Sequence, residues 1–452
     1  MIVQTYTIAR NTFVESVRQP FVLILILISG VLQLFNTWNS NFSMGQMDSS
    51  EVSGDTKLLF DIGLATVFVV GTLLAGFLAT AAMSREIENK TVLTIISKPV
   101  SRPVLVLGKY LGVTIAILAS MIVMLVFLHM ALRHGVMSTT ADDLDGPVIT
   151  FSLLAIFLSV SLAGWCNFFY GWNFPQTSVG LLVPLIIVAW FGTLFIGKGW
   201  HLQNPLTDLR PQIVLASLCL GLAVLVLCAV ALAASTRLGQ VATIVVCLGV
   251  FVASLLSNYF IGRHVFTNDF IAVVAKSTPD DPERTTFAQP GDVQRLTLQQ
   301  APTRPLAVGD AIFFGPTPNG FPLSTHGSFG RFEGDMTELR SIIGPGVPSA
   351  VIVTEVDGLD LAIRNIGELP VRIDGPPARG DYLFTQPTRI NPVALGLWGG
   401  IPNMQFYWLL DAVSQNRPVP PAYFGLTILY TFSQVGVFLS LAMILFQRRD
   451  VG

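Results

Sequence analysis

The sequence predicts an α-helical polytopic membrane protein with about eight spans and an inserted β-rich extracytoplasmic domain. The first reason is composition: hydrophobic residues make up 52% of the 452 residues and charged residues only 12%, whereas soluble domains carry roughly 25% charged residues. The second reason is a series of apolar runs long enough to cross a bilayer. The third is a stretch after residue 260 in which long apolar runs give way to short ones separated by turn residues.

The apolar runs define the predicted spans, because a helix needs about 20 mostly apolar residues to cross the hydrocarbon core. Eight segments qualify: 21–35, 58–83, 110–132, 148–170, 178–197, 212–235, 240–260 and 421–446. The first is short and is expected to extend over a few polar residues. The pair 148–170 and 178–197 could include a broken or re-entrant helix around residues 171–175. We therefore predict a transmembrane bundle over 21–260, and a last span with a tail over 421–452.

Residues 1–20 are predicted to form an amphipathic helix that lies along the membrane interface. Apolar side chains recur at spacings of three and four, and polar side chains occupy the other side. The apolar set is Ile2, Tyr6, Ala9, Phe13 and Val17, and the polar set is Arg10, Asn11, Glu15 and Arg18. Pro20 would end this helix before the first span. The alternative is a frayed tail.

The distribution of lysine and arginine predicts the orientation, because cytoplasmic loops carry an excess of both. An even number of spans puts the two termini on one side. With that side inside, the cytoplasmic set is Arg10, Arg18, Arg85, Lys90, Lys98, Arg102, Lys109, Arg237, Arg448 and Arg449. The opposite short loops hold Lys57, Arg133, Lys198 and Arg210, with Arg263 at the start of the long exterior segment. Both termini are therefore expected in the cytoplasm, and the protein in the inner (plasma) membrane.

Residues 261–420 are expected to form the extracytoplasmic domain. Short β-branched runs at 311–314, 350–354, 361–363 and 371–373, separated by turn residues, predict a small β-rich module. Residues 276–305 resemble a linker or a mobile loop. The aromatic residues within 391–418 fit an interfacial helix before the last span, or else the core of the exterior domain.

Several function classes find no support in the sequence. The net charge of −2, without a long lysine or arginine run, excludes nucleic acid as a partner. The four cysteines lie inside apolar runs, and the five histidines are scattered without metal-ligand spacing. His129 and His134 fall at a span end, where a solvated position is expected. No G-x-x-x-x-G-K-[ST] loop or G-x-S-x-G motif occurs, so the chain is predicted to be neither an ATPase nor another enzyme, with no cofactor of its own.

The energy for any transport is expected to come from another subunit. Ion-coupled carriers place ionisable groups at mid-bilayer depth, and here the middles of the spans are almost free of them. Asp61 and Lys109 lie near predicted span ends, within reach of the interface. Residues 84–102, between two spans, combine charges, the isoleucine pair Ile95-Ile96 and a Lys-Pro break, which indicates a cytoplasmic docking element for an ATPase. The alternative is an amphipathic loop that merely follows the positive-inside bias.

The chain resembles the membrane subunits of ABC-type export permeases. The matching pieces are the amino-terminal helix, residues 85–91 leading to 97–102, residues 108–110 at the next span, 235–237 between spans, 401–411, and the ending 445–450. The resemblance implies that 84–102 is a coupling helix in a cleft of the nucleotide-binding subunit, where ATP-Mg would bind. The docking residues are Arg85, Glu86, Glu88, Lys90, Thr91, Leu93, Ile95, Ile96, Lys98 and Arg102.

Within this set, Leu93, Ile95 and Ile96 are suited to an apolar cleft, and the charged residues to its rim. The resemblance also implies a second permease chain in the lipid bilayer, as a homodimer or heterodimer, together with two cytoplasmic ATPase subunits. Gly71, Ala75 and Ala79, at four-residue spacing, could mark either a subunit contact or packing within one chain.

Three alternatives remain beside an exporter. They are an ATPase-driven mechanotransmission or structural complex without solute transport, a secondary transporter, and a membrane-embedded enzyme. The last would need clustered acids or histidines at one membrane face, and none are found. The substrate is unknown, and no substrate-binding residue is predicted.

Overall fold

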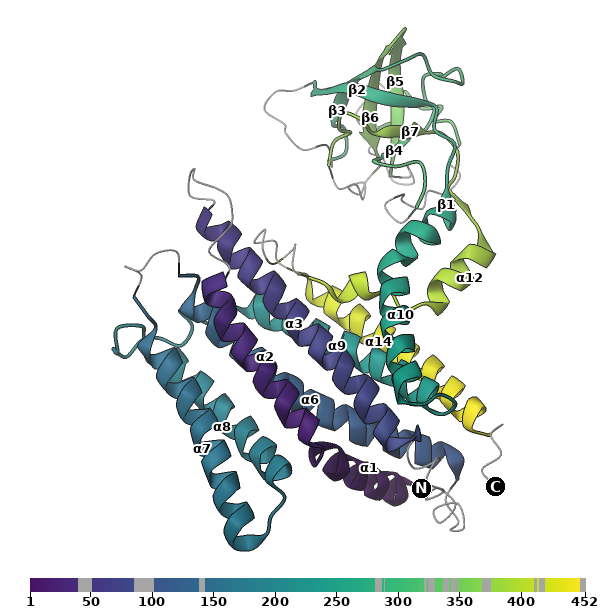
Figure 1. Ribbon diagram of the computed structural model, residues 1–452. Helices are drawn as coiled ribbons and strands as arrows, with labels where there is room; N and C mark the ends of the chain where they lie inside the picture. The colour runs from purple at the N-terminus through teal and green to yellow at the C-terminus, as the bar shows by residue number, and fades with distance from the viewer. Residues whose placement is uncertain are drawn as a thin grey trace. The chain divides into compact units, whose positions relative to one another are not determined.

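The computed structural model describes residues 1–39, 51–84, 101–137, 143–280, 287, 289–320, 323, 330–335, 341–342, 347, 349–367, 375–409, 413 and 419–447. The chain divides into two compact units (Figure 1). One unit joins Met1–Val252 with Met404–Gly452 and contains most of the helices. The other, Ala253–Asn403, contains the strands.

The eight predicted spans are confirmed as helices long and apolar enough to cross a membrane. They are α2 (Pro20–Asn39), α3 (Glu51–Ala82), α6 (Arg102–His134), α7 (Gly146–Tyr170), α8 (Phe174–Phe195), α9 (Pro211–Ser235), α10 (Gln240–Phe260) and α14 (Pro421–Gln447). The largest boundary error is at α6, predicted to start at residue 110. Ser101 and Pro103 favour the earlier start, since proline is well suited to the first helical turn.

A tight turn joins α7 and α8, where a broken or re-entrant helix was a possibility. Gly171 ends α7 in the left-handed conformation (φ 66°), which glycine adopts without steric cost. Asn173 then caps α8, because its side chain accepts a hydrogen bond from the Gln176 N–H at 3.1 Å. The two segments are therefore two complete antiparallel helices, packed against each other.

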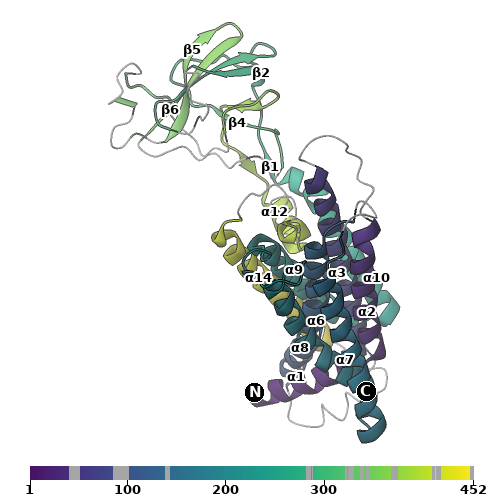
Figure 2. The same cartoon turned by 90° about the vertical axis from the view of Figure 1, so that its left-hand side faces the viewer.

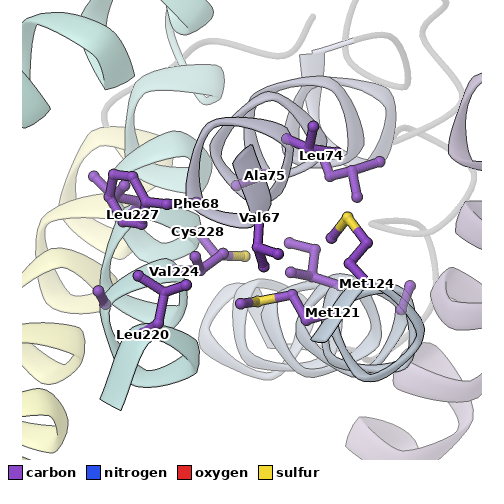
Figure 3. Close-up of a cluster of buried hydrophobic side chains, with 14 of the residues drawn as sticks. Val67, Phe68, Leu74, Ala75, Met121, Met124, Leu220, Val224, Leu227 and Cys228 are labelled. Carbon is purple, nitrogen blue, oxygen red and sulfur yellow. The ribbon is translucent and has the colours of Figure 1, made fainter. Parts of the chain in front are cut away.

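The centre of the bundle is the apolar contact of α3, α6 and α9 (Figure 3). Side chains of all three helices meet there, including Val67, Met121 and Val224, which are buried. The small-residue row of α3 belongs to this contact. A Cβ added at Gly71 would lie 3.2 Å from Val224, and Ala75 is fully buried. The row thus serves packing within the chain, and the subunit-contact alternative is wrong for these residues.

Helix α1 (Ile2–Val17) lies crosswise to the long helices (Figure 2) and packs against the first part of α6. Two glycines permit the close approach. A Cβ at Gly108 would lie 2.7 Å from Ile8 Cβ, and one at Gly112 would lie 2.5 Å from the Ala9 carbonyl oxygen. The buried face of α1 consists of Ala9, Thr12, Ser16 and Val17, so it is partly polar and overlaps the predicted apolar face only at Ala9 and Val17. Apolar side chains such as Ile2 are left exposed.

We expect Gly112→Ala to destabilise the bundle by about 1–3 kcal/mol, the usual range for overpacking. The added methyl would collide with the backbone of α1, which cannot give way as a side chain can. Gly221→Ala in α9 is the matched control, since its Cβ would meet nothing within 4 Å. Thermal unfolding of both variants in the same detergent measures the difference. Equal melting temperatures would contradict the close contact.

The second unit contains a six-stranded antiparallel sheet with strand order β4-β7-β2-β3-β6-β5. Its strands are β2 (Ala272–Pro279), β3 (Val293–Leu298), β4 (Phe313–Gly315), β5 (Ala350–Asp357), β6 (Asp360–Ile366) and β7 (Tyr382–Phe384). A separate pair, β1 (Phe266–Thr267) with β8 (Arg389–Ile390), carries the chain into and out of the sheet. The β-rich prediction is confirmed, and the predicted strand at 371–373 falls outside the described residues.

The linker predicted over 276–305 is wrong, because it contains the end of β2 and the whole of β3. In β3, Gln294 and Leu296 are buried while Arg295 is exposed. Strands with polar residues on both faces carry a weak apolar signal. The segment forms a strand because Leu296 pairs with Leu361 of β6 in the core of the sheet unit.

The helix predicted over 391–418 is wrong in its extent. Two short elements occupy its described part, α12 (Pro392–Gly400) and the 3₁₀ helix η3 (Met404–Tyr407). The buried Tyr407 hydroxyl lies 3.0 Å from Thr431 Oγ1 of α14. η3 is therefore part of the core of the helical unit, whereas α12 belongs to the other unit.

Candidate functional site

The predicted docking segment, 84–102, connects the end of α3 to the start of α6. Nine of its predicted contact residues lie outside the described residues: Arg85, Glu86, Glu88, Lys90, Thr91, Leu93, Ile95, Ile96 and Lys98. Only its ends, Ser84, Ser101 and Arg102, are described. Docking to an ATPase by these residues stays a prediction.

The two ends of the docking segment lie at one end of the helical unit, together with other turns. Arg18, before α2, donates a hydrogen bond to Gln176 at the start of α8 at 2.8 Å. Arg102, at the start of α6, reaches the end of α14. At the opposite end, the Met137 N–H donates to the Thr37 carbonyl oxygen at 3.1 Å. We call the first end the coupling face. It comprises Arg18, residues 84 and 101–102, and the end of α14.

Exposed aromatic rings lie near the coupling face, at the turn between α7 and α8. They are Trp165, Phe168, Phe169, Tyr170 and Trp172. Tryptophan and tyrosine concentrate at the level of the lipid headgroups, where an apolar ring and a polar atom both find suitable surroundings. These rings fit a membrane interface at this level of the bundle.

Two arginines hold the end of α14 at the coupling face. Arg102 Nη1 donates to the carbonyl oxygens of Gln447 at 2.7 Å and Phe446 at 3.3 Å, and its guanidinium lies 5.7 Å from the centre of the Phe446 ring. Arg237, in the turn after α9, donates from Nε to the Leu445 carbonyl oxygen at 3.1 Å. The last carbonyls of a helix have no partner within the helix and carry a partial negative charge, so cations stabilise this end.

These contacts connect three spans mechanically. A displacement of the docking segment at Arg102 would move α14 directly. Through α14 it would also move the turn that carries Arg237. Both arginines were predicted to be cytoplasmic from charge distribution alone. Their shared partner could not be foreseen, since the contacts join residues more than 200 positions apart.

A buried ion-pair cluster lies at the opposite end of the bundle and was missed by sequence reasoning. Arg133 Nε lies 3.0 Å from Asp208 Oδ2 and 3.4 Å from Asp145 Oδ2. Its Nη atoms donate to the carbonyl oxygens of Thr193 and, at 2.6 Å, of Ile196 at the end of α8. One guanidinium thereby ties α6 to α8, to the start of α7 and to the segment before α9. We name Arg133, Asp145 and Asp208 the Arg133 cluster.

Two members of the Arg133 cluster are well shielded from solvent, whereas the side chain of Asp208 is 28% exposed. The side chain of Asp145 is 1% exposed and that of Arg133 is 8% exposed. Asp145 also caps α7, because its Oδ1 accepts a hydrogen bond from the Val148 N–H at 3.1 Å. Gln203 donates to Asp208 Oδ2 at 2.6 Å. Of the three cluster residues, only Asp145 could have been found from the sequence. An acidic residue directly before Gly146-Pro147 is a pattern that marks the start of a helix.

Two expectations about ionisable groups near span ends are corrected. Lys109 is buried, at 3% exposure, because α6 begins at Arg102 and places it inside the helix. His129 is largely buried rather than solvated, with its ring edge against Trp190 at 5.7 Å. Among the described residues, no group of three or more His, Cys, Asp or Glu side chains could hold a metal ion.

Comparison with known protein families gives a match to the first part of the chain. The family model of the ABC-2 family transporter proteins matches residues 6–165, which include most of α1, the docking segment and most of α7. No curated protein matches the chain. The matched stretch contains three complete candidate spans, α2, α3 and α6, and most of a fourth, α7. The match covers about a third of the chain, and it supports a membrane permease subunit of an ABC-type transporter.

Proposed function

We propose that this permease exports a substrate across the membrane, driven by a separate ATPase that binds residues 84–102 from the cytoplasm. Permeases of the matched family work with an ATPase subunit. The observation that carries the proposal is the contact of Arg102 with the end of α14, because it links the docking segment to a second span. A push on the segment would then shift the helix bundle between two states.

The complex would contain two permease chains, as a homodimer or heterodimer, and two ATPase subunits. The complex would lie in the inner (plasma) membrane. Its coupling face would be on the cytoplasmic side. The excess of arginine and lysine at this end supports the orientation. ATP-Mg would bind in the partner, since this chain has no phosphate-binding loop.

Purification of the tagged full chain from native membranes in mild detergent tests the proposal. We expect a nucleotide-binding subunit to copurify, and the complex to hydrolyse ATP. Lipids or solutes bound to the complex would identify the substrate class. A chain that copurifies with no ATPase, and whose activity follows an ion gradient, would favour the secondary-transporter alternative instead.

The two arginines at α14 give a specific prediction for coupling. We expect the double variant Arg102→Gln and Arg237→Gln to raise amide hydrogen exchange in the last turn of α14 at least roughly tenfold, since a hydrogen bond to a charged donor contributes about 1.5–3 kcal/mol. The full-length variant should still copurify with the ATPase but hydrolyse ATP without transport. Arg18→Gln is the control, because that arginine contacts Gln176 on the same face and not α14. Unchanged exchange and transport in the double variant would contradict the role.

A mechanotransmission complex remains a second candidate because the strands form a compact unit of their own. The pairing of Thr267 with Arg389 suggests a clean deletion: residues 268–388 replaced by Asn-Gly, a two-residue turn suited to hairpins. An exporter should keep ATP-driven transport in this variant. If the complex with the ATPase still assembles in this variant but its ATP-driven activity is lost, mechanotransmission is favoured.

A further inference from the structure

Strand β2 extends beyond the strand beside it. In the ladder that the structure describes, β7 pairs with Ala272 and Val273, the first two of the eight residues of β2. The last bonds on this side join Val274 to Asp381 and to Gly380, at 2.9 and 2.8 Å. Residues 376–379, before Gly380, form no described ladder with β2. The β7 side of β2 is therefore an open edge over residues 275–279.

A groove lies along this edge. It has a volume of about 580 Å³ and is lined by residues 275–277 and 279 of β2, by residues 376–379, and by Gln294 of β3. Gln294 is buried, and its Nε2 donates a hydrogen bond to Ser277 Oγ at 2.8 Å. The volume falls within the range of about 300–1,000 Å³ that is usual for binding sites.

The backbone of Ser277 points into this groove. Backbone groups along a strand face its two neighbours in alternation, and the register of β2 against β3 is regular from Lys276 to Pro279. The Asp280 N–H donates to the Val293 carbonyl oxygen of β3 at 3.2 Å. Three residues earlier, the N–H and C=O of Ser277 therefore face away from β3, and neither has a backbone partner among the described residues. Open edges of this kind accept an added strand.

The groove is positively charged. Lys276 and Arg379 line it, both are exposed, and no carboxylate lines it. The nearby acidic side chains have other partners: Asp280 lies 2.8 Å from Arg295, and Asp381 accepts a backbone N–H at 2.7 Å. Within the described part of the chain, neither Lys276 nor Arg379 forms an ion pair. The charge of the groove therefore favours an acidic occupant.

Two residues of β2 restrict the choice of occupant further. Lys276 and Pro279 are of the types that keep an open edge from pairing with another sheet, because the lysine brings a charge and the proline lacks an N–H. An acidic segment compensates the lysine and needs few backbone bonds. Across the groove, Pro376 and Pro377 offer apolar surface to its other side chains.

We propose that this groove binds an extended acidic segment of a partner protein, which adds to the open edge of β2. The backbone of the segment exchanges hydrogen bonds with Ser277, and its carboxylates pair with Lys276 and Arg379. The partner meets the sheet unit on the extracytoplasmic side, where this unit is expected. This role goes beyond the proposed transport function and does not depend on it.

Dye-labelled synthetic peptides test the proposal on the full-length protein in nanodiscs of zwitterionic lipid. The probe is a short peptide of alternating valine and glutamate, and fluorescence anisotropy measures its binding. We expect this peptide to bind, and the same peptide with lysine in place of glutamate not to bind. The double variant Lys276→Glu and Arg379→Glu should weaken binding at least roughly tenfold, because like charges then face each other. Arg304→Glu is the matched control, since this exposed arginine of the same unit does not line the groove.

The backbone contact is tested on the unmodified protein, with the glutamate peptide methylated on its amide nitrogens. This peptide keeps its charge but cannot donate backbone hydrogen bonds, so it should bind at least roughly tenfold more weakly. Equal binding of the methylated peptide would indicate a site for anions rather than for a strand, and it overturns the proposal. The proposal also fails if the glutamate peptide does not bind, if the lysine peptide binds as well, or if the Lys276/Arg379 variant keeps full affinity.

Discussion

The double variant Ile95→Asp and Ile96→Asp is expected to lose copurification with the ATPase while the permease stays folded. Both side chains are predicted to anchor in an apolar cleft of the partner, where a carboxylate would be stripped of water without a compensating charge. Central apolar anchors of an interface each contribute about 2 kcal/mol or more. Loss of both, at about 4 kcal/mol, corresponds to roughly a thousandfold weaker binding. The measurement is the amount of ATPase recovered per permease from the same membranes.

The control for this experiment introduces the same two charges elsewhere. Val356→Asp and Leu359→Asp change half-exposed apolar side chains at the β5–β6 turn of the sheet unit. ATPase recovery should be unaffected there. Equal recovery of the ATPase with the Ile95/Ile96 variant and with this control would rule out residues 84–102 as the docking element.

Arg133→Gln is expected to produce the largest loss of stability of any single substitution considered for this chain. It leaves the buried Asp145 carboxylate without its cation, along with Asp208 and two carbonyl oxygens at the end of α8. Removal of one partner of a buried ion pair typically costs about 3–5 kcal/mol, because the remaining charge stays desolvated. Thermal and chemical unfolding of the purified full chain measure this loss.

An exposed ion pair provides the comparison. Arg389 lies 3.0 Å from Asp269, the same distance as Arg133 from Asp208, but both partners are more than half exposed. Arg389→Gln should change stability by about 1 kcal/mol or less. Adding Asp145→Asn and Asp208→Asn to Arg133→Gln should recover part of the loss, since no unpaired charge then remains. Equal effects of Arg133→Gln and Arg389→Gln would contradict the buried cluster.

The spans could be predicted because their physical cause is local: a continuous apolar run of sufficient length leaves the backbone little choice but a helix in a bilayer. The end of a span depends instead on single residues. Arg102 and Lys109 made the first turns of α6 look like a loop, and only Ser101 and Pro103 indicate the true start. Strand β3 was missed because its buried Leu296 alternates with polar residues, and its order comes from neighbouring strands.

The functional contacts were less accessible to sequence reasoning. The docking segment is continuous in sequence, so its charges and isoleucines could be recognised together. The Arg133 cluster joins residues from α6, α7 and the segment before α9, which no local spacing brings together. His129 was expected to be solvated because it is near a span end, yet Trp190 of α8 covers its ring. Long-range packing, absent from any short pattern, decides such environments.

The central claim is that residues 84–102 face the cytoplasm and meet the motor subunit there. The most direct measurement is labelling of single cysteines in intact cells with a membrane-impermeant maleimide, in a chain whose four native cysteines are replaced. We expect Asp357→Cys, in the sheet unit, to react from outside, and Ser97→Cys to react only after the membrane is permeabilised. Labelling of Ser97→Cys in intact cells would contradict the account.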